Sequence, residues 1–217
     1  MTAGDPAERL RFIHRYVAPA ASGPTAAVTI LALHGTGGDE NDLVGLAGAA
    51  LPGAGILSPR GRVLENGMPR FFRRVAEGVF DEADLVAQVG ALATFVTDAA
   101  TVYHFDGGRV VALGFSNGAN IAAALLLLHP RVLRAAALLR AMVPLVPATL
   151  PALNGTSVLL SAGAHDPIVP RANTERLAAM LRQAGAEVEL HWEAVGHALS
   201  AHELGVLRSW MERTATG

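Results

Sequence analysis

Short apolar runs alternate with amphipathic stretches along most of the chain, and this alternation predicts an α/β fold. Apolar runs of strand length predict strands over residues 27–33, 55–58, 110–115, 135–143 and 157–162, and strict alternation predicts another over 187–195. Residues 9–17 also alternate, which predicts an edge strand or a hairpin. Continuous apolar runs are typical of strands covered on both faces, so we expect a mostly parallel sheet.

Stretches with helical spacing lie between the apolar runs. In residues 82–102, Leu85, Val89, Leu92 and Val96 recur on one face. Further helices are expected over about residues 41–51, 117–128, 173–184 and 200–213. Strand and helix therefore follow each other nearly throughout, which predicts helices on both faces of the sheet and a site at the carboxyl ends of its strands. We expect one domain over residues 1–217.

Residues 59–81 form a long stretch without regular spacing. Three of the seven phenylalanines lie in it, Phe71, Phe72 and Phe80, close to Arg70, Arg73 and Arg74. Loops of this length in compact domains are usually functional, so the stretch is one candidate wall of a binding cleft. An equally good interpretation is a satellite hydrophobic cluster that only holds the loop down. We expect Arg73 and Arg74 on the solvated surface.

Composition narrows the function classes. Of the 217 residues, 51% are hydrophobic and 17% are charged, which favours a well-buried globular protein. The net charge of −2 gives no electrostatic reason to expect binding to nucleic acid or an anionic membrane. The chain has no cysteine, which excludes disulfides, thiolate metal sites and a cysteine nucleophile. Its polar first residues predict no secretion signal and its longest apolar run is too short to span a bilayer, so we expect a cytoplasmic protein without a membrane span. Phosphate-loop and dinucleotide-binding patterns are both incomplete, and no cofactor is expected.

The stretch around Ser116 carries the strongest chemical signal. Gly114-Phe-Ser-Asn-Gly118 matches G-x-S-x-G and stands between a predicted strand and a predicted helix. That context is the one in which the pattern indicates a nucleophile elbow, a sharp turn that exposes a serine hydroxyl. Glycines at both ends let the turn close without collisions, and free N–H groups of the helix point at the same place.

A serine hydroxyl needs a base within reach, and the base needs a carboxylate to orient it. Asp166 follows the strand predicted over 157–162, and His197 follows the last predicted strand, so both fit the expected order of serine, acid and histidine. The competing acids lie in a helix or along a strand: Glu175, Glu187, Glu189 and Glu193. The competing histidines are less well placed, since His191 lies in a strand, His202 lies in a helix, and His165 is expected to shape its loop.

Two backbone N–H groups are needed to stabilise the negatively charged oxygen of a tetrahedral intermediate. One is expected from Asn117, the residue after the serine. The other is expected from Thr36, in the glycine-rich loop that follows the early central strand.

Four motifs together resemble the phospholipase/carboxylesterase family of α/β-hydrolases. They are Leu33-His-Gly-Thr-Gly-Gly-Asp-Glu-Asn-Asp-Leu43, Gly114-Phe-Ser-Asn-Gly118, Gly163-Ala-His-Asp-Pro-Ile-Val-Pro170 and Gly196-His197. The resemblance implies an α/β-hydrolase fold without a large cap domain, a Ser116–His197–Asp166 triad, and Thr36 and Asn117 as oxyanion donors. Thr36, Asp39 and Glu40 resemble the bacterial carboxylesterase branch more than the acyl-protein thioesterases. A homodimer is expected by resemblance only.

The expected activity is that of a serine carboxylesterase acting on short- to medium-chain acyl esters, with Phe71, Phe72 and Met142 as candidates for the acyl pocket. An acyl thioesterase or a lysophospholipase would use the same machinery, and a non-catalytic binding protein of this fold is a further alternative. A metal hydrolase is not expected, because the histidines show no ligand spacing along the chain.

Overall fold

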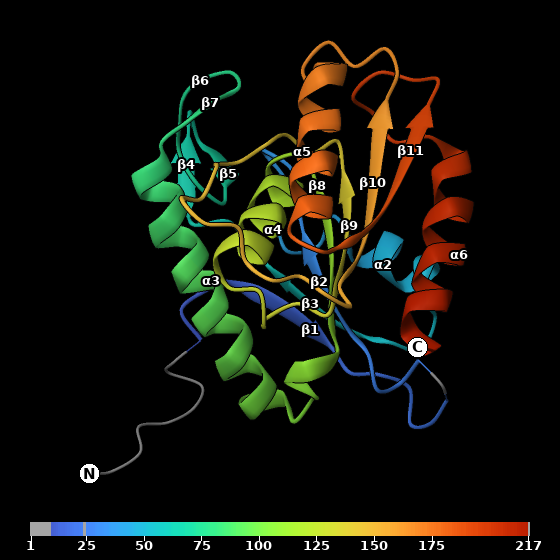
Figure 1. The fold of residues 1–217 in the computed structure, drawn as a ribbon. Helices are drawn as coiled ribbons and strands as arrows, with labels where there is room; N and C mark the ends of the chain where they lie inside the picture. Colours follow the sequence, from blue (N-terminus) through green and yellow to red (C-terminus); the bar gives the residue numbers. More distant parts are fainter. Residues whose placement is uncertain (1–9, 24, 217) are drawn as a thin grey trace.

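The computed structural model describes residues 10–23 and 25–216, with the side chain of Thr216 left out. Its centre is a seven-stranded sheet in the order β1-β3-β2-β8-β9-β10-β11 (Figure 1). These strands are β1 (His14–Val17), β2 (Thr29–Leu33), β3 (Gly55–Pro59), β8 (Val110–Phe115), β9 (Ala135–Leu139), β10 (Ser157–Gly163) and β11 (Glu187–Glu193). The edge strand β1 is antiparallel to β3, and the other neighbours in this sheet are parallel. The predicted α/β fold and edge strand are confirmed, although Arg9 lies outside the described residues.

Helices cover both faces of the sheet, as Figure 1 shows. They are α2 (Val44–Ala50), α3 (Glu82–Tyr103), α4 (Asn117–Leu128), α5 (Arg171–Gln183) and α6 (Ala201–Thr216), with a short 3-10 helix at Gly107–Arg109. Side chains of α3, α4 and α5 share one hydrophobic core, and those of α2 and α6 share the other. This layered arrangement is that of an α/β-hydrolase, and the described residues contain no large cap domain.

The central strands supply side chains to both cores. In β2, Leu31 and Leu33 face the core of α3, α4 and α5, whereas Ile30 and Ala32 face that of α2 and α6. Burial of one such aliphatic side chain stabilises the fold by about 1.5–3 kcal/mol. Strands covered on both sides explain why their sequences are continuously apolar rather than alternating.

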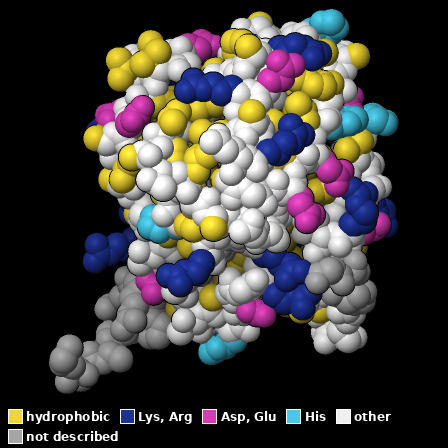
Figure 2. Space-filling view, in the orientation of Figure 1, with side chains coloured by type: hydrophobic (Ala, Val, Ile, Leu, Met, Phe, Trp, Pro, Cys, Tyr) yellow, Lys and Arg dark blue, Asp and Glu magenta, His cyan; other side chains and the backbone are white. Residues whose placement is uncertain are grey.

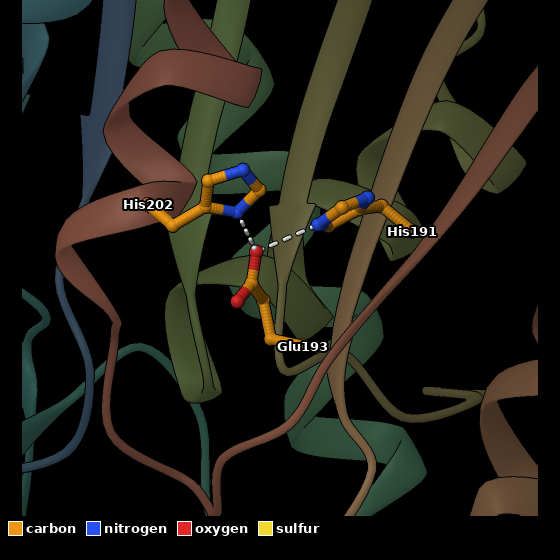
Figure 3. A group of neighbouring side chains, drawn as sticks. All are labelled: His191, Glu193 and His202. Atoms are coloured by element: carbon orange, nitrogen blue, oxygen red, sulfur yellow. Dashed lines mark hydrogen bonds and ion pairs between the residues drawn. The ribbon is translucent and has the colours of Figure 1, made fainter.

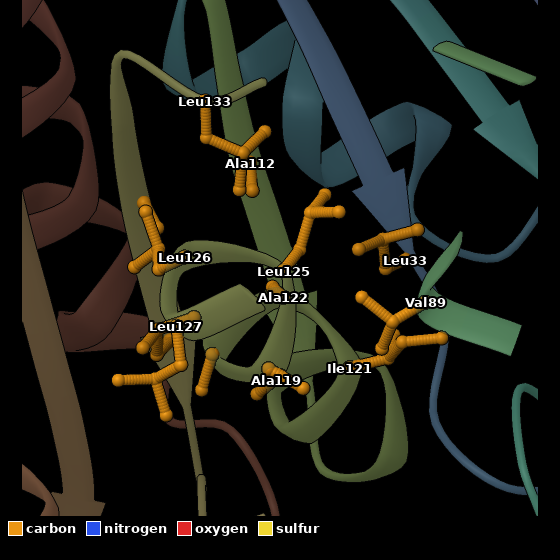
Figure 4. Close-up of a cluster of buried hydrophobic side chains, with 14 of the residues drawn as sticks. Leu33, Val89, Ala112, Ala119, Ile121, Ala122, Leu125, Leu126, Leu127 and Leu133 are labelled. Atoms are coloured by element: carbon orange, nitrogen blue, oxygen red, sulfur yellow. The ribbon is translucent and has the colours of Figure 1, made fainter. Parts of the chain in front are cut away.

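The helix α4 lies in the middle of the larger core. Figure 4 shows Ala119, Ala122 and Leu125 of α4 among side chains from β2, β8 and α3. The small residue Gly118 brings the first turn of α4 against β2, since a Cβ there would overlap the backbone carbonyl of Leu33. The start of α4 is therefore fixed by backbone contact with the neighbouring strand.

The long helix α3 is apolar and long enough to cross a membrane by length and composition alone. Core helices of globular proteins pass the same test. Its predicted face of Leu85, Val89, Leu92 and Val96 is buried in the core that α3 shares with α4. Asp81 caps its first turn by accepting a hydrogen bond from the backbone N–H of Asp84.

Most predicted elements shift at their ends by up to three residues, and a few predictions change more. The strand expected over residues 135–143 ends at Leu139, because Arg140 adopts a φ of 59° that breaks the extended backbone. Residues 59–81 are not fully irregular. They contain two small hairpins, β4 (Val63–Glu65) with β5 (Met68–Arg70) and β6 (Arg74–Ala76) with β7 (Val79–Phe80).

A buried ion pair joins the end of β9 to α6. Both terminal nitrogens of Arg140 bond the carboxylate of Glu203 at 2.7 Å, and the Arg140 side chain is 0% exposed. The hydroxyl of Ser161, on β10, donates to the same carboxylate. Burial opposes ionisation of Glu203, but the bonds from Arg140 and Ser161 prevail and lower its pKa below the ordinary value.

The close contact between α4 and β2 predicts that a methyl group added at Gly118 will destabilise the fold. We expect Gly118→Ala to lower the free energy of unfolding by more than about 2 kcal/mol, because neither backbone can withdraw without disturbing the core. Gly205→Ala, on the exposed side of α6 where a Cβ meets nothing within 4 Å, should be neutral or stabilising by up to about 1 kcal/mol. Urea unfolding of both variants measures the difference. Equal stability of the two would contradict the proposed backbone contact.

The ion pair predicts a pH-dependent stability difference. A carboxylate whose pKa is lowered by folding stabilises the native state above its unfolded pKa of about 4.3, and this stabilisation is lost as the pH falls through the folded pKa. Glu203→Gln should therefore destabilise the protein most near pH 7, by about 3–5 kcal/mol since Arg140 is left unpaired, and progressively less below pH about 4. Thermal melts from pH 7 to pH 3 test this. Glu175→Gln, at an exposed pair, is the control and should change stability by less than about 1 kcal/mol. A difference between wild type and Glu203→Gln that is constant over this range would refute the prediction.

Candidate active site

Ser116 occupies the turn between β8 and α4. Its φ of 52° and ψ of −114° lie outside the regions that side-chain-bearing residues ordinarily adopt. The turn is tight, because a Cβ on Gly114 would lie 2.6 Å from the carbonyl oxygen of Gly118. Strand, turn and helix thus follow one another as the G-x-S-x-G pattern predicts, with the serine at the carboxyl end of β8.

The three predicted residues form a chain of hydrogen bonds. Ser116 Oγ lies 2.9 Å from His197 Nε2, and His197 Nδ1 lies 2.8 Å from Asp166 Oδ2. An ionised carboxylate only accepts, so His197 Nδ1 carries the hydrogen and a neutral ring leaves Nε2 free to accept from the serine hydroxyl. Asp166 lies 50 positions after Ser116 along the chain, and His197 lies 81 positions after it. The fold therefore brings three distant residues together at one edge of the sheet.

Asp166 is held from behind by its own loop. Its second oxygen, Oδ1, accepts hydrogen bonds from the backbone N–H groups of Ile168 at 2.8 Å and Val169 at 3.1 Å. The carboxylate is 1% exposed, so these bonds and the imidazole replace water around it. The arrangement leaves one oxygen directed at His197.

The loop that carries His197 is held by Arg140. Its guanidinium donates to the carbonyl oxygens of Gly196 at 3.2 Å and Ala198 at 2.8 Å, the residues on either side of His197. In the sequence, Arg140 lies inside the strand predicted over residues 135–143, and its role in this loop was not foreseen. A charged residue directly after a buried apolar run was the available signal, because buried charges are normally paired.

Thr36 and Asn117, the two predicted oxyanion donors, line the same cleft as Ser116. The side chains of both also make other bonds: Thr36 Oγ1 accepts from Arg70 at 2.8 Å, and Asn117 Oδ1 accepts from the backbone N–H of Phe71 at 2.7 Å. These bonds attach residues 59–81 to the elbow and to the first loop. Nearby His34 Nε2 accepts from the backbone N–H of Gly61 at 2.9 Å, and burial lowers the pKa of His34, which favours the neutral ring that this bond needs.

A cleft of about 340 Å³ opens over Ser116. Its walls come from six parts of the chain, and the lining residues other than Ser116, His197, Thr36 and Asn117 are Arg70, Arg74, Glu77, Gly78, Phe80, Phe115, Asn120, Met142 and Ile168. The lining thus combines charged and apolar side chains. This small, mixed cleft suits a compact substrate with a polar portion.

Of the three pocket candidates, one lines the cleft and two are buried away from it. Met142 lines it, but Phe71 and Phe72 are 1% and 0% exposed and pack in the core beneath it. Phe71 and Phe72 therefore fit the alternative interpretation, in which a hydrophobic cluster holds the loop in place. Phe80 lines the cleft in their place.

Arg73 and Arg74 are neighbours in the sequence but lie in different surroundings. Arg73 is exposed and pairs with Asp81 and Asp84, as expected of a surface residue. Arg74 does not fit that expectation, because it faces the cleft and pairs with Glu65. Which side of a short hairpin faces the serine could not be read from the sequence.

Two of the competing histidines are bonded to Glu193. His191 Nε2 and His202 Nδ1 each lie 2.7 Å from Oε1 of this carboxylate (Figure 3). The bonds from His191 and His202 lower the pKa of Glu193 to about 2. The expectation of no metal ligands rested on spacing along the chain, whereas folding assembles two imidazoles and a carboxylate here. The side chain of His165, next to Asp166, is exposed, and its backbone N–H donates a hydrogen bond to the carbonyl oxygen of Val195.

Comparisons with known proteins identify the family of this chain. The family profile described as Phospholipase/Carboxylesterase matches residues 16–215. MhqD of Bacillus subtilis (strain 168), classed by its name as a hydrolase, is 47% identical over 181 residues, which is 83% of this chain and 90% of that protein.

Two solved structures are similar over nearly the whole chain. The Bacillus cereus carboxylesterase is 44% identical with a TM-score of 0.90, covering 94% of this chain and 95% of that one. The carboxylesterase from Mesorhizobium loti is 32% identical with a TM-score of 0.85, at 94% and 95% coverage. The chain therefore belongs to the phospholipase/carboxylesterase family and is a hydrolase of the carboxylic ester class.

Proposed function

We propose that this protein is a serine carboxylesterase that hydrolyses short- to medium-chain acyl esters through Ser116, His197 and Asp166. The observation that carries the proposal is the unbroken line of hydrogen bonds from Ser116 Oγ through the imidazole to the Asp166 carboxylate, at 2.9 Å and 2.8 Å. Its location at the floor of a cleft gives a substrate access to the hydroxyl.

In the first half-reaction, His197 Nε2 takes the proton of Ser116 as Oγ attacks the ester carbonyl carbon. The carboxylate of Asp166 stabilises the imidazolium that forms and keeps its Nε2 directed at the serine. The imidazolium then returns its proton to the alcohol oxygen as the C–O bond breaks. The alcohol departs and the acyl group stays on Ser116.

The negative charge that develops on the carbonyl oxygen requires donors that are already in place. The backbone N–H of Asn117, at the first position of α4, and that of Thr36 are the proposed pair. Loss of one such donor typically raises the barrier by about 3 kcal/mol. The hydrogen bonds that hold Thr36 and Asn117 to residues 59–81 support their role, because the donors need no rearrangement during the reaction.

In the second half-reaction a water replaces the alcohol. His197 Nε2 takes its proton, the hydroxide attacks the acyl carbonyl, and the carbonyl oxygen again uses the two N–H groups. Collapse releases the carboxylic acid and returns the proton to Ser116. The carboxylic acid and alcohol leave separately, so steady-state kinetics should follow a ping-pong pattern.

The cleft supports a small substrate. Its volume of about 340 Å³ is near the lower end of the range for ligand sites. Met142, Phe80 and Ile168 provide apolar contact for an acyl chain, while Arg74 and Glu77 add charged groups to the lining. A long acyl chain would have to extend past these charged groups.

Thioester and lysolipid hydrolysis use the same residues and are the second candidate function. Parallel assays with a short ester, an acyl thioester and a lysolipid discriminate between them by kcat/KM. A non-catalytic binding protein of this fold would fail to react with a fluorophosphonate probe. We expect the enzyme to act in the cytoplasm as a single domain, without nucleic acid and without a cofactor, and a homodimer remains an expectation from the family resemblance.

Replacement of the nucleophile is the direct test. Ser116→Ala should lower kcat for a short p-nitrophenyl ester by at least about a thousandfold and abolish fluorophosphonate labelling, because no other residue supplies the attacking oxygen. Ser209→Ala, on the exposed face of α6, is the matched control and should keep both. Ester turnover retained by folded Ser116→Ala protein would overturn the assignment.

The corrected pocket predicts a change in chain-length preference. Phe80→Ala should raise kcat/KM for longer acyl chains relative to acetate several-fold, because it widens the cleft beside Met142. Phe71→Leu should lower the melting temperature without altering that ratio, since Phe71 is 1% exposed and packs in the core. Rates with acetate, butyrate and octanoate esters measure both, and the reverse pattern would restore Phe71 as a pocket residue.

A further inference from the structure

A second group of chemically active side chains lies outside the cleft. It consists of His191 and Glu193 from β11 and His202 from α6, as Figure 3 shows. Residues two apart on a strand point to the same side, so the imidazole and carboxylate of β11 both face α6. The ligand atoms of all three residues lie within 4.8 Å of one another.

We propose that His191, Glu193 and His202 bind one divalent transition-metal ion, with Zn²⁺ as the matching probe. Two imidazole nitrogens and one carboxylate oxygen are a donor set that Zn²⁺ favours, whereas Mg²⁺ and Ca²⁺ prefer oxygen donors alone. Three protein ligands leave a fourth position for water. The site is independent of the proposed esterase activity, because it uses none of the residues assigned to catalysis.

The distances fit a site that binds its ion after a small adjustment. The two N–O separations of 2.7 Å are hydrogen-bond lengths, and ligands around a tetrahedral ion at 2.0–2.1 Å are about 3.3 Å apart. The carboxylate and each imidazole must therefore separate by about 0.6 Å to admit the ion. His202, whose side chain is 73% exposed, is free to make this movement.

The carboxylate is supported from its other side. Ser200 Oγ donates to Glu193 Oε2 at 3.1 Å, which leaves Oε1 directed at the two imidazoles. Bonds of this kind to the non-ligating atoms of a metal ligand orient it and strengthen binding. The Glu193 side chain is 10% exposed and that of His202 is 73% exposed. The site thus combines a buried, fixed carboxylate with an exposed imidazole that can move.

Binding requires an unprotonated nitrogen on each imidazole. In the present arrangement His191 Nε2 and His202 Nδ1 donate their hydrogens to Glu193. A neutral imidazole can carry its hydrogen on the other ring nitrogen instead. Each ring can therefore change tautomer and offer the metal ion the nitrogen that now faces Glu193. No redox partner is involved, and any imidazolium present releases its proton to solvent.

An ion at this position would join the end of β11 to the first turn of α6. The segment between them, residues 194–200, carries His197. Metal binding should therefore stabilise the native state and this loop in particular.

Isothermal titration of the untagged protein with ZnCl₂ at pH 7.5 tests the proposal. We expect one equivalent to bind the wild type, and affinity to fall by more than about 100-fold in His202→Ala and Glu193→Gln, because loss of a direct ligand exceeds the 10–100-fold typical of an outer partner. His129→Ala, which removes a histidine outside the group, should bind as the wild type does. Zn²⁺ at 100 times its Kd should raise the melting temperature by about 5 °C or more in the wild type but not in His202→Ala.

Two titration results would overturn the site. One is absence of binding to the wild type at 1 mM ZnCl₂, and the other is equal binding by wild type and a His191→Ala/His202→Ala double variant. Anomalous scattering from a zinc-soaked crystal locates the ion, and a peak at His197 and Asp166 instead would also refute the proposal. Ser116→Ala should bind Zn²⁺ normally, so failure of the esterase assignment and failure of the metal site are distinguishable.

Discussion

The close approach of α4 to β2 is the constraint on which the site depends. A backbone that carries no side chain at Gly118 rests against the carbonyl of Leu33, and this contact places the helix start directly behind the serine. The unusual conformation of Ser116 persists because the residues that follow it are buried on every side. Packing of the largest core thus maintains a turn that an isolated peptide would not adopt.

The site is assembled from loops that follow parallel strands, and each loop has its own attachment. Backbone N–H groups hold Asp166, Arg140 holds the segment around His197, and Asn117 holds residues 59–81. Each attachment connects parts of the chain that meet only in the fold. The alignment of the three hydrogen-bonded side chains is therefore a property of the whole sheet edge rather than of any single loop.

Features encoded locally could be predicted from the sequence. The strand–turn–helix around Ser116, the apolar face of α3 and the order of serine, acid and histidine each depend on neighbouring residues or on topology. Residues that depend on side-chain direction were missed. Phe71 and Phe80 are both phenylalanines in one stretch, yet one enters the core and the other the cleft, because short hairpins set their directions. The meeting of His191 with His202 likewise follows from how β11 packs on α6, which spacing does not encode.

The ion pair between Arg140 and Glu203 has a consequence for how the protein loses activity. The guanidinium bonds the loop of His197 and is also anchored to Glu203 in the first turn of α6, so the proposed general base is tied to the start of the last helix. Detachment of that helix, by heat or by a protease acting near the C-terminus, would release the histidine while the rest of the sheet stays folded. Inactivation of this molecule would then report fraying of its final segment rather than global melting.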